Sequence, residues 1–388
     1  MNRWPRAKLG DIAPIVRRPV EIDIDKAYPE LGIRSFGKGT FHKPALAGTE
    51  VGSKRLFGIE PGDLIFSNVF AWEGAVAVAQ PEDDGRFGSH RFITCAVDPK
   101  RAIASFLSRY LTATPDGLEQ LRRASPGGAG RNRTLGIEKL AEIEVPLPPL
   151  TEQQAIVTRL DTLADKVRQV AEHLDAIEAD AERLLAVRFR EAIADAPHRP
   201  MAEVAPAVRR SVQLDIATRY REIGARSFGK GLFVKPDFDG AEATWEKPVW
   251  IESGDLVLSN IKAWEGAIGL AGPEHHGAIA SHRYITCVPS VESATAGFLA
   301  YYLRSPDGLE KIGLASPGTA DRNRTLSLTN LGKIKVPVPS ITIQQTFDIL
   351  QAKVAELKAG HTTIRQANAA LVPATLERIF QPGVASPT

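Results

Sequence analysis

The fold follows from residues 146–167, which read PLPPLTEQQAIVTRLDTLADKV. From Ile156 onward, apolar residues recur at alternating spacings of four and three residues. They are Ile156, Leu160, Leu163, Val167, Val170, Leu174, Ile177, Ala181 and Leu184. This 3.5-residue period is typical of a coiled-coil seam, and the positions between are mostly charged residues or Ala, which form solvated helices well. A helix of roughly 40 residues reaches about 60 Å, longer than a small domain is wide. The sequence therefore predicts a spacer helix over residues 150–195.

Length and composition indicate a globular protein of two or three domains. The chain has 388 residues, of which 43% are hydrophobic and 24% charged, with a net charge of +2. It contains no apolar run of 18 residues, and its first residues lack the apolar segment of a signal peptide, so we expect no membrane span and a cytoplasmic location. Cys95 and Cys287 are too few for a disulfide framework, and we expect both to be small core residues.

The chain is an internal duplication. RSFGKGTFHKP, from Arg34, returns as RSFGKGLFVKP from Arg226, which is 192 residues further on. GDLIFSNVFAWEGA, from Gly62, returns at the same offset as GDLVLSNIKAWEGA. A period of this size indicates two globular units rather than a stacked array of short repeats.

Each unit is predicted to be mixed α/β (α+β), and each is followed by a long helix. The second helix has a less regular seam. The predicted seam positions of this second helix are Phe347, Leu350, Val354, Leu357, His361, Ile364, Asn368 and Leu371. We expect the two helices to pair as an antiparallel coiled coil that relates the units by a pseudo-two-fold; packing on one domain or dimerisation between chains is the alternative. The expected domains are residues 1–149, 150–195, 196–340 and 341–380, with a flexible tail over 381–388.

The arrangement resembles the DNA-specificity (S) subunit of type I restriction–modification systems. The resemblance rests on PLPPLTEQQ and PVPSITIQQ, the two joins between a globular unit and its helix, and it covers nearly the whole chain. It implies two target-recognition domains that read the two parts of a split site in double-stranded DNA, with the helices setting the distance between them. It also implies two docked methyltransferase (modification) subunits, and leaves open whether restriction/translocase subunits join. The chain itself would carry no cofactor; its partners would use S-adenosylmethionine, ATP and Mg.

One departure from this family bears on the target. Its two recognition domains are typically unlike, whereas these two are clearly alike. Similar readers related by a two-fold read similar half-sites on opposite strands. We therefore expect a bipartite, near-palindromic site.

Three segments in each unit are candidates for DNA contact. The RSFG loop (residues 34–43 and 226–235) offers cations for phosphates and planar groups for bases. Its candidates are Arg34, Ser35, Lys38, Lys43, Arg226, Ser227, Lys230 and Lys235. Its alternative role is a Gly-rich structural turn, and we expect Phe36 and Phe228 to enter the core.

The RNR segment (residues 125–134 and 316–325) is the leading candidate, because Arg pairs bidentately with guanine and Asn with adenine. Its candidates are Arg131, Asn132, Arg133, Thr134, Arg322, Asn323, Arg324 and Thr325. In the alternative interpretation, one Arg pairs with an acidic residue of its own domain.

The WEG segment (residues 67–74 and 259–266) adds amide and carboxylate groups, since Glu can accept from cytosine N4. With two arginines that open later strands, its candidates are Asn68, Glu73, Asn260, Lys262, Glu265, Arg91 and Arg283. The repeats differ where Phe70 matches Lys262, His42 matches Val234 and Gly130 matches Asp321, which predicts half-sites that differ at one or two positions.

No catalytic motif is apparent. The sequence has no phosphate-binding Gly-Lys-Ser/Thr loop, no amino-methyltransferase motif and no metal-ligand spacing of His or Cys. We therefore expect a non-catalytic reader. The alternatives are a duplicated protein-interaction scaffold, or a self-contained nuclease or methyltransferase with an unrecognised site.

Overall fold

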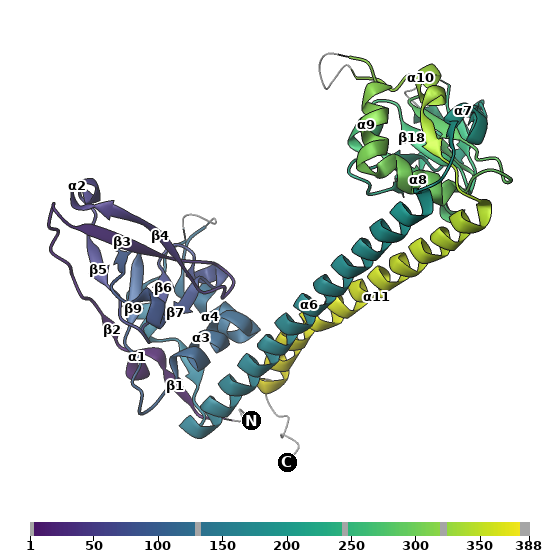
Figure 1. Ribbon diagram of the computed structural model, residues 1–388. Helices are drawn as coiled ribbons and strands as arrows, with labels where there is room; N and C mark the ends of the chain where they lie inside the picture. Colours follow the sequence, from purple (N-terminus) through teal and green to yellow (C-terminus); the bar gives the residue numbers. More distant parts are fainter. Residues whose placement is uncertain (1–3, 129–132, 243–246, 319–323, 381–388) are drawn as a thin grey trace. The chain divides into compact units, whose positions relative to one another are not determined.

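The computed structural model describes residues 4–128, 133–242, 247–318 and 324–380, so the predicted tail over 381–388 lies outside the described residues (Figure 1). The chain divides into two compact units. Unit 1 comprises Met1–His173 and Thr363–Thr388, and unit 2 comprises Leu174–Thr362. Each unit includes part of two long helices, α6 (Leu150–Ile193) and α11 (Ile341–Phe380).

Unit 1 contains two four-stranded sheets. One has the order β2-β9-β6-β7 and is antiparallel; the other has the order β4-β3-β8-β5, in which only β3 and β8 run parallel. A short antiparallel pair, β1-β10, joins the N-terminal segment to the strand before α6. The elements are β1 (Arg6–Lys8), α1 (Leu9–Ile12), β2 (Ile15–Val16), β3 (Ala27–Ile33), β4 (Thr40–Ala47), α2 (Gly48–Val51), β5 (Leu56–Gly58), β6 (Leu64–Ser67), η1 (Ala71–Glu73), β7 (Val76–Val78), η2 (Pro81–Asp83), β8 (Phe87–Ser89), β9 (Phe92–Cys95), α3 (Ala104–Ala113), α4 (Pro115–Ala124), α5 (Ile137–Ala141) and β10 (Glu144–Pro146).

Unit 2 repeats this plan with shorter strands. The antiparallel sheet β12-β21-β18-β19 matches the first sheet of unit 1, and β11-β22 matches β1-β10. Where unit 1 has its second sheet, unit 2 has the pairs β13-β16, β14-β15 and β17-β20. The elements are β11 (His198–Pro200), α7 (Met201–Val204), β12 (Ala207–Val208), β13 (Arg219–Tyr220), β14 (Ile223–Ala225), β15 (Leu232–Val234), β16 (Phe238–Asp239), η4 (Gly240–Glu242), β17 (Val249–Ile251), β18 (Leu256–Ser259), η5 (Ala263–Glu265), β19 (Ile268–Leu270), η6 (Pro273–His275), β20 (Ala278–Ala280), β21 (Tyr284–Cys287), α8 (Ala296–Arg304), α9 (Pro306–Leu314), α10 (Leu328–Lys333) and β22 (Lys335–Pro337).

The long helices contribute to the core of both units. In unit 1, Leu160 of α6 and Phe380 of α11 pack with the buried Phe106 of α3. In unit 2, the Phe189 ring of α6 lies 5.3 Å from the Phe347 ring of α11. Burying large aromatic side chains anchors each helix to its globular unit, since each such side chain removes a large apolar area from water.

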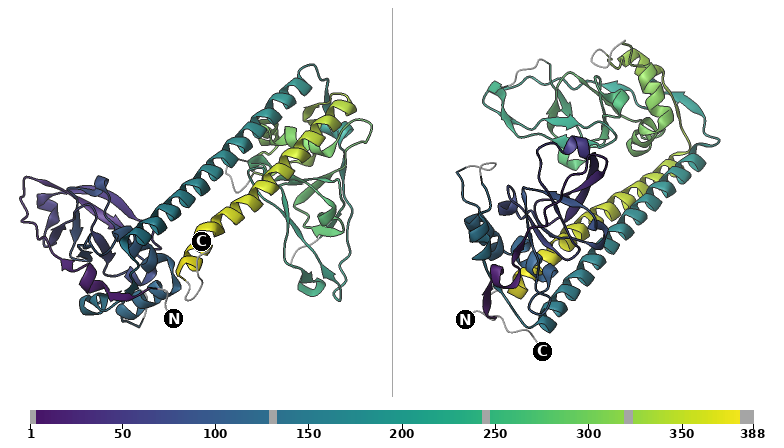
Figure 2. Two further views of the ribbon diagram at one scale, coloured as in Figure 1. Left: turned by 90° about the horizontal axis from the view of Figure 1, so that it is seen from below. Right: turned by 90° about the vertical axis from the view of Figure 1, so that its left-hand side faces the viewer.

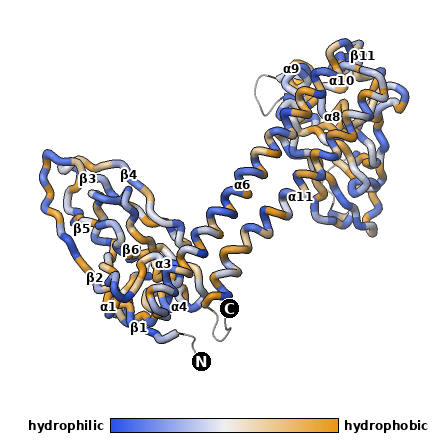
Figure 3. Tube along the Cα trace, turned by 60° about the horizontal axis from the view of Figure 1, so that its bottom comes forward, coloured by the Kyte–Doolittle hydropathy of each residue, from blue (hydrophilic) through white to orange (hydrophobic). Residues whose placement is uncertain are grey.

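The two helices run antiparallel within unit 2. Going backward along α6, Glu182 pairs with Lys358, and the Glu178 carboxylate lies 2.9 Å from Nδ1 of His361. Figure 2 shows both helices uninterrupted from two further sides, and Figure 3 shows the alternation of hydrophobic and hydrophilic residues along them. The predicted pairing of the long helices as an antiparallel coiled coil within one chain is confirmed.

The predicted seam is wrong over part of each helix. Ile177 and Leu184 are 45% and 44% exposed, while the neighbouring Leu185 is buried. Likewise Ile364 and Leu371 are exposed in α11. The buried stripe follows the 3.6-residue period of a straight helix, which drifts by about 20° per heptad from a 3.5-residue repeat, so the buried positions move on by one residue.

The first glutamine of each TEQQ-like join locks its helix to the globular unit. Gln153 is fully buried; its Oε1 accepts from the Ile103 amide at 2.9 Å, and its Nε2 donates to the carbonyls of Arg101 and Pro148. Gln344 makes the matching three hydrogen bonds in unit 2. The Gln in this signature therefore closes the joint between α6 or α11 and the segment that opens α3 or α8.

Candidate nucleic-acid interface

The RSFG loop and the WEG segment of unit 1 are joined by main-chain hydrogen bonds. The Phe36 and Gly37 amides donate to the carbonyls of Glu73 and Gly74, both at 2.9 Å. Ser35 Oγ donates to the Glu73 carboxylate at 3.2 Å. Two segments predicted separately as DNA contacts thus form one rigid surface, and the loop is narrower than expected because β4 already begins at Thr40.

Unit 2 repeats the same bonds. The Phe228 and Gly229 amides donate to the carbonyls of Glu265 and Gly266 at 2.7 and 3.1 Å. Ser227 Oγ donates to the Glu265 carboxylate at 2.9 Å. The shared geometry extends the sequence repeat to the arrangement of the candidate residues.

The expectation that Phe36 and Phe228 enter the core is wrong. Their side chains are 69% and 79% exposed, and their backbones are left-handed, with φ of 62° and 60°. Because the amide and carbonyl of this tight turn are fixed against the WEG segment, the aromatic residue must take a conformation that costs an L-residue roughly 1–2 kcal/mol.

The described part of the RNR segment in unit 1 packs onto the same surface. The Arg133 guanidinium lies 5.2 Å from the centre of the Trp72 ring. The Trp72 indole donates to the Val69 carbonyl, and the Leu135 amide donates to the Asn68 carbonyl at 2.8 Å. Trp72 thereby holds a cation against its face, as an aromatic quadrupole favours.

In unit 2, Arg324 lies 4.7 Å from the Trp264 ring centre and donates to the Gly313 carbonyl. The Leu326 amide donates to the Asn260 carbonyl at 2.6 Å. Thr134 and Thr325 each close their loop by an amide hydrogen bond to the preceding Pro carbonyl. Arg131, Asn132, Arg322, Asn323, Gly130 and Asp321 lie outside the described residues.

Asn68 and Asn260 connect these loops to the strand that follows. Each amide N–H donates to the carbonyl of the nearby Arg91 or Arg283, at 2.7 and 2.8 Å. Each side-chain Oδ1 is buried and has no hydrogen-bond partner in the part of the chain that the structure describes. The arginine side chains are exposed, so Arg91 and Arg283 remain available to an anion.

The remaining cations of the RSFG loop in unit 1 stack on rings of the same loop. Arg34 lies over Phe41 at 5.1 Å and donates to a carbonyl in its own turn, while Lys38 Nζ lies 5.9 Å from the exposed Phe36 ring. Lys43 is half-buried on β4. One cation, Lys38, therefore lies beside the exposed Phe36 ring, and Arg34 belongs to the same loop.

The matching cations of unit 2 are partly neutralised. Arg226 lies over Phe233 at 4.4 Å and Lys230 is exposed, but Lys235 pairs with Glu222 at 2.7 Å. Lys235 is therefore already committed to an intramolecular pair in this structure.

Two differences between the repeats change the chemistry of the surface. In unit 2, Lys262 Nζ lies 2.6 Å from the Glu265 carboxylate and, with the weaker help of Ser227, holds the pKa of Glu265 below its usual value. In unit 1 the matching residue is the exposed Phe70, so Glu73 has no lysine at this position.

The second difference lies beside the loop. His42 Nε2 and Thr40 Oγ1 both contact the buried Asp83 carboxylate, at 2.9 and 3.0 Å. In unit 2 the residues at the positions of His42 and Asp83 are Val234 and His275. Asp83 and its partner His42 are thus both replaced in unit 2. No buried carboxylate is left at that position without its hydrogen-bond partner.

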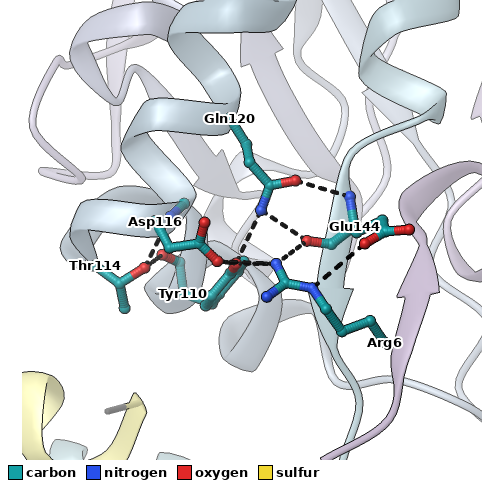
Figure 4. A network of polar contacts seen from close by, with 7 residues as sticks. Arg6, Tyr110, Thr114, Asp116, Gln120 and Glu144 are labelled. Atoms are coloured by element: carbon teal, nitrogen blue, oxygen red, sulfur yellow. Dashed lines mark hydrogen bonds and ion pairs between the residues drawn. The ribbon is translucent and has the colours of Figure 1, made fainter. Parts of the chain in front are cut away.

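A polar network that sequence reasoning missed joins α3 and α4 to β1 and β10 in unit 1 (Figure 4). Arg6 Nη2 donates to Tyr110 and Asp116, both at 2.8 Å, and Gln120 bridges Tyr110 and the Glu144 main chain. Burial tends to raise the pKa of Asp116, but hydrogen bonds from Tyr110 and Arg6 outweigh it and lower that pKa. No local pattern marks these residues, because they come from β1, α3, α4 and β10.

In unit 2 a lysine takes over part of this network. Lys311 Nζ donates to Tyr302 and Asp307, at 2.6 and 2.9 Å. The same tyrosine–aspartate pair is therefore held by a cation from a different element, which supports a structural role for the network in both units.

The comparisons with known proteins agree with this architecture. Residues 1–179 match the family model of the type I restriction modification DNA specificity domain. The fold is similar to that of the HsdS subunit from Thermoanaerobacter tengcongensis, with 20% identity, a TM-score of 0.62, and coverage of 97% of this chain and 96% of that chain.

A second solved structure comes from work on complex assembly and conformational transition of the type I R-M system. It has 21% identity, a TM-score of 0.69, and coverage of 97% of both chains. None of the curated proteins compared with the chain matches it. Within the described ranges, no helix is long and apolar enough to cross a membrane, and no group of three His, Cys, Asp or Glu side chains could hold a metal ion.

Proposed function

We propose that the chain is the sequence-specific DNA-binding specificity subunit of a type I restriction–modification complex. The observation that carries this proposal is the repeated convergence of the RSFG loop, the WEG segment and the RNR segment in both units. Each surface presents arginines and lysines beside exposed aromatic rings, which suits phosphate neutralisation together with base contact.

The target is proposed to be bipartite and near-palindromic. Both surfaces share Arg, Ser, Trp and Glu at matched positions. They therefore present similar side chains to DNA and should recognise similar half-sites. The exchange of Phe70 for Lys262 sets one difference: Glu73, which has no lysine at this position, can accept from cytosine N4, whereas Lys262 beside Glu265 adds a donor suited to guanine. One to two base positions should therefore distinguish the half-sites.

Methyltransferase subunits are proposed to dock on the long helices, and the catalytic groups to belong to those partners. The exposed apolar residues Ile177 and Leu184 on α6 support this, as does a groove of about 520 Å³ beside Phe347 and Leu350. Replacing Ile177 and Leu184 by Asp should reduce copurification of the modification subunit and leave the folding of this chain unchanged. Equal copurification with the variant would contradict this docking surface.

The experiment that tests the function is co-expression with candidate modification subunits, followed by genome-wide mapping of methylated sites. We expect one bipartite motif whose halves are related on opposite strands. Two unrelated half-sites would refute near-palindromic reading. Methylation that does not depend on this chain, or binding of the complex to DNA that is insensitive to salt and sequence, would refute the proposed function.

A further inference from the structure

Phe36 and Phe228 are the least expected features of the two candidate surfaces. A side chain of this size that is more than two-thirds exposed gains little from folding. It also stands in a left-handed backbone that Gly or Asn would tolerate better. The same residue with the same φ and exposure occurs in both units, 192 residues apart. The strained, exposed arrangement is therefore present in both copies of the duplicated unit.

The turn that carries each ring is rigid. In unit 1 the backbone on either side of the ring is fixed by the amide hydrogen bonds of Phe36 and Gly37, and a Cβ at Gly37 would lie 2.7 Å from Thr112 Oγ1. In unit 2, a Cβ at Gly266 would lie 3.2 Å from the Gly229 amide nitrogen. Strain that the surroundings enforce in this way is typical of a functional site rather than of a flexible loop.

The charged residues near each ring favour nucleic acid over protein as the binding partner. Lys38 lies over the Phe36 ring, Arg34 opens the same loop, and Arg133 lies over the Trp72 ring of the WEG segment. Lys230 and Arg226 occupy the matching positions in unit 2. An exposed ring on a surface that also carries lysine and arginine fits a stacked base between phosphates better than an apolar protein surface, which would bury these charges.

We propose that Phe36 and Phe228 act as aromatic wedges, each of which stacks on or between bases of its half-site and unstacks them locally. This inference rests on the proposed function and deepens it, because it adds distortion of the duplex to hydrogen-bond reading of base edges. The strained turn is already formed before DNA binds and fixes the direction of the ring. Little conformational freedom of the side chain is therefore lost on binding.

The test uses the complex with its modification subunits and a duplex of the mapped site, with 2-aminopurine replacing adenines in one half-site at a time. With the unaltered complex, we expect the fluorescence to rise in both half-sites as bases unstack. F36G should abolish the rise in one half-site and F228G in the other, each with roughly a tenfold loss of affinity, the order of one stacked base. Phe36→Trp and Phe228→Trp should restore the signal, and Phe36→Leu should not.

Stability provides an independent control. Because glycine relieves the left-handed strain, F36G and F228G should unfold at the same temperature as the parent chain or a few degrees higher. As control variants, Ile24→Ala in unit 1 and Val291→Ala in unit 2, two other exposed apolar residues, should alter neither fluorescence nor affinity. If F36G and F228G lose DNA binding and also unfold at a lower temperature, the two rings have a structural role and the wedge is refuted.

The outcomes separate the two proposals. If the complex with the unaltered chain does not bind the mapped duplex, the proposed function fails. If it binds with a fluorescence rise that F36G and F228G leave intact, the wedge is refuted while the DNA-reading function stands. If the glycine variants lose affinity but fluorescence never rises in the parent complex, the rings contact DNA without unstacking it, and the wedge is likewise refuted.

Discussion

Replacing Gln153 by Ala tests whether the glutamine of the helix join is the lock between α6 and unit 1. The side chain is fully buried and makes three hydrogen bonds to the main chain, from Ile103 and to Arg101 and Pro148. Each bond contributes about 1 kcal/mol net, and leaving a buried partner unsatisfied costs about 1–3 kcal/mol. We therefore expect Q153A to lower the free energy of unfolding by about 3–5 kcal/mol.

The neighbouring glutamines provide matched controls. Gln154 and Gln345 occupy the next position in each helix and are exposed, so Q154A and Q345A should change stability by less than about 0.5 kcal/mol. Q344A should reproduce the loss in unit 2, since Gln344 repeats all three bonds.

Urea unfolding and hydrogen exchange together provide the assay. Exchange at the Ile103 amide, which is protected by Gln153 Oε1 at 2.9 Å, should accelerate in Q153A, while exchange at Thr295 in unit 2 stays unchanged. Q344A should give the opposite result. Equal losses in Q153A and Q154A, or no local gain in exchange at Ile103, would refute a structural role for this glutamine.

Three further predictions concern the candidate surface, a buried thiol and pH. R133A and R324A should each reduce the slope of log affinity against log salt by about 1, and lysine at either position should restore the slope but not the full affinity, as measured by titrations at several salt concentrations. Burial, with a smaller effect of a nearby aspartate, raises the pKa of Cys95 and of Cys287 to about 12, so both thiols should react with a disulfide reagent at pH 8 only when the chain unfolds. Because the folded pKa of Asp116 is lowered, its carboxylate stabilises the fold above pH about 4, and this contribution disappears as the pH falls through the folded pKa. D116N should cost about 1 kcal/mol at pH 7, and thermal unfolding should show this cost shrinking as the pH is lowered.

The architecture was predictable because its signals are periodic. The apolar periodicity of the helix at residues 150–193 extends over many turns, and the 192-residue repeat predicts two similar units. The strands β3 and β4 were missed, because Pro29, Gly32 and Pro44 interrupt the alternation that marks a strand.

The candidate surface was predictable in its membership but not in its geometry. Composition pointed to the RSFG loop, the WEG segment and the RNR segment, but only the fold brings the Phe36 amide to Glu73 and Arg133 to Trp72. The prediction that Phe36 enters the core was wrong because it relied on how often phenylalanine is buried in proteins on average. In this turn, the main-chain hydrogen bonds determine the direction of the side chain. The network around Tyr110 had no signal at all, since its members share neither motif nor spacing.

The difference between the predicted and observed helix seams connects the opening sequence to assembly. Apolar residues along α6 keep a 3.5-residue repeat, but the straight helix buries a 3.6-residue stripe, so Ile177 and Leu184 are left in solvent where a supercoiled pair would have covered them. In α11 the same drift exposes Ile364 and Leu371. These four side chains are 43–45% exposed, so burial uses only part of their apolar surface, yet they extend the heptad pattern in both helices. The pattern is consistent with helices that bury one stripe against each other and leave a second stripe for the proposed docking of partner subunits.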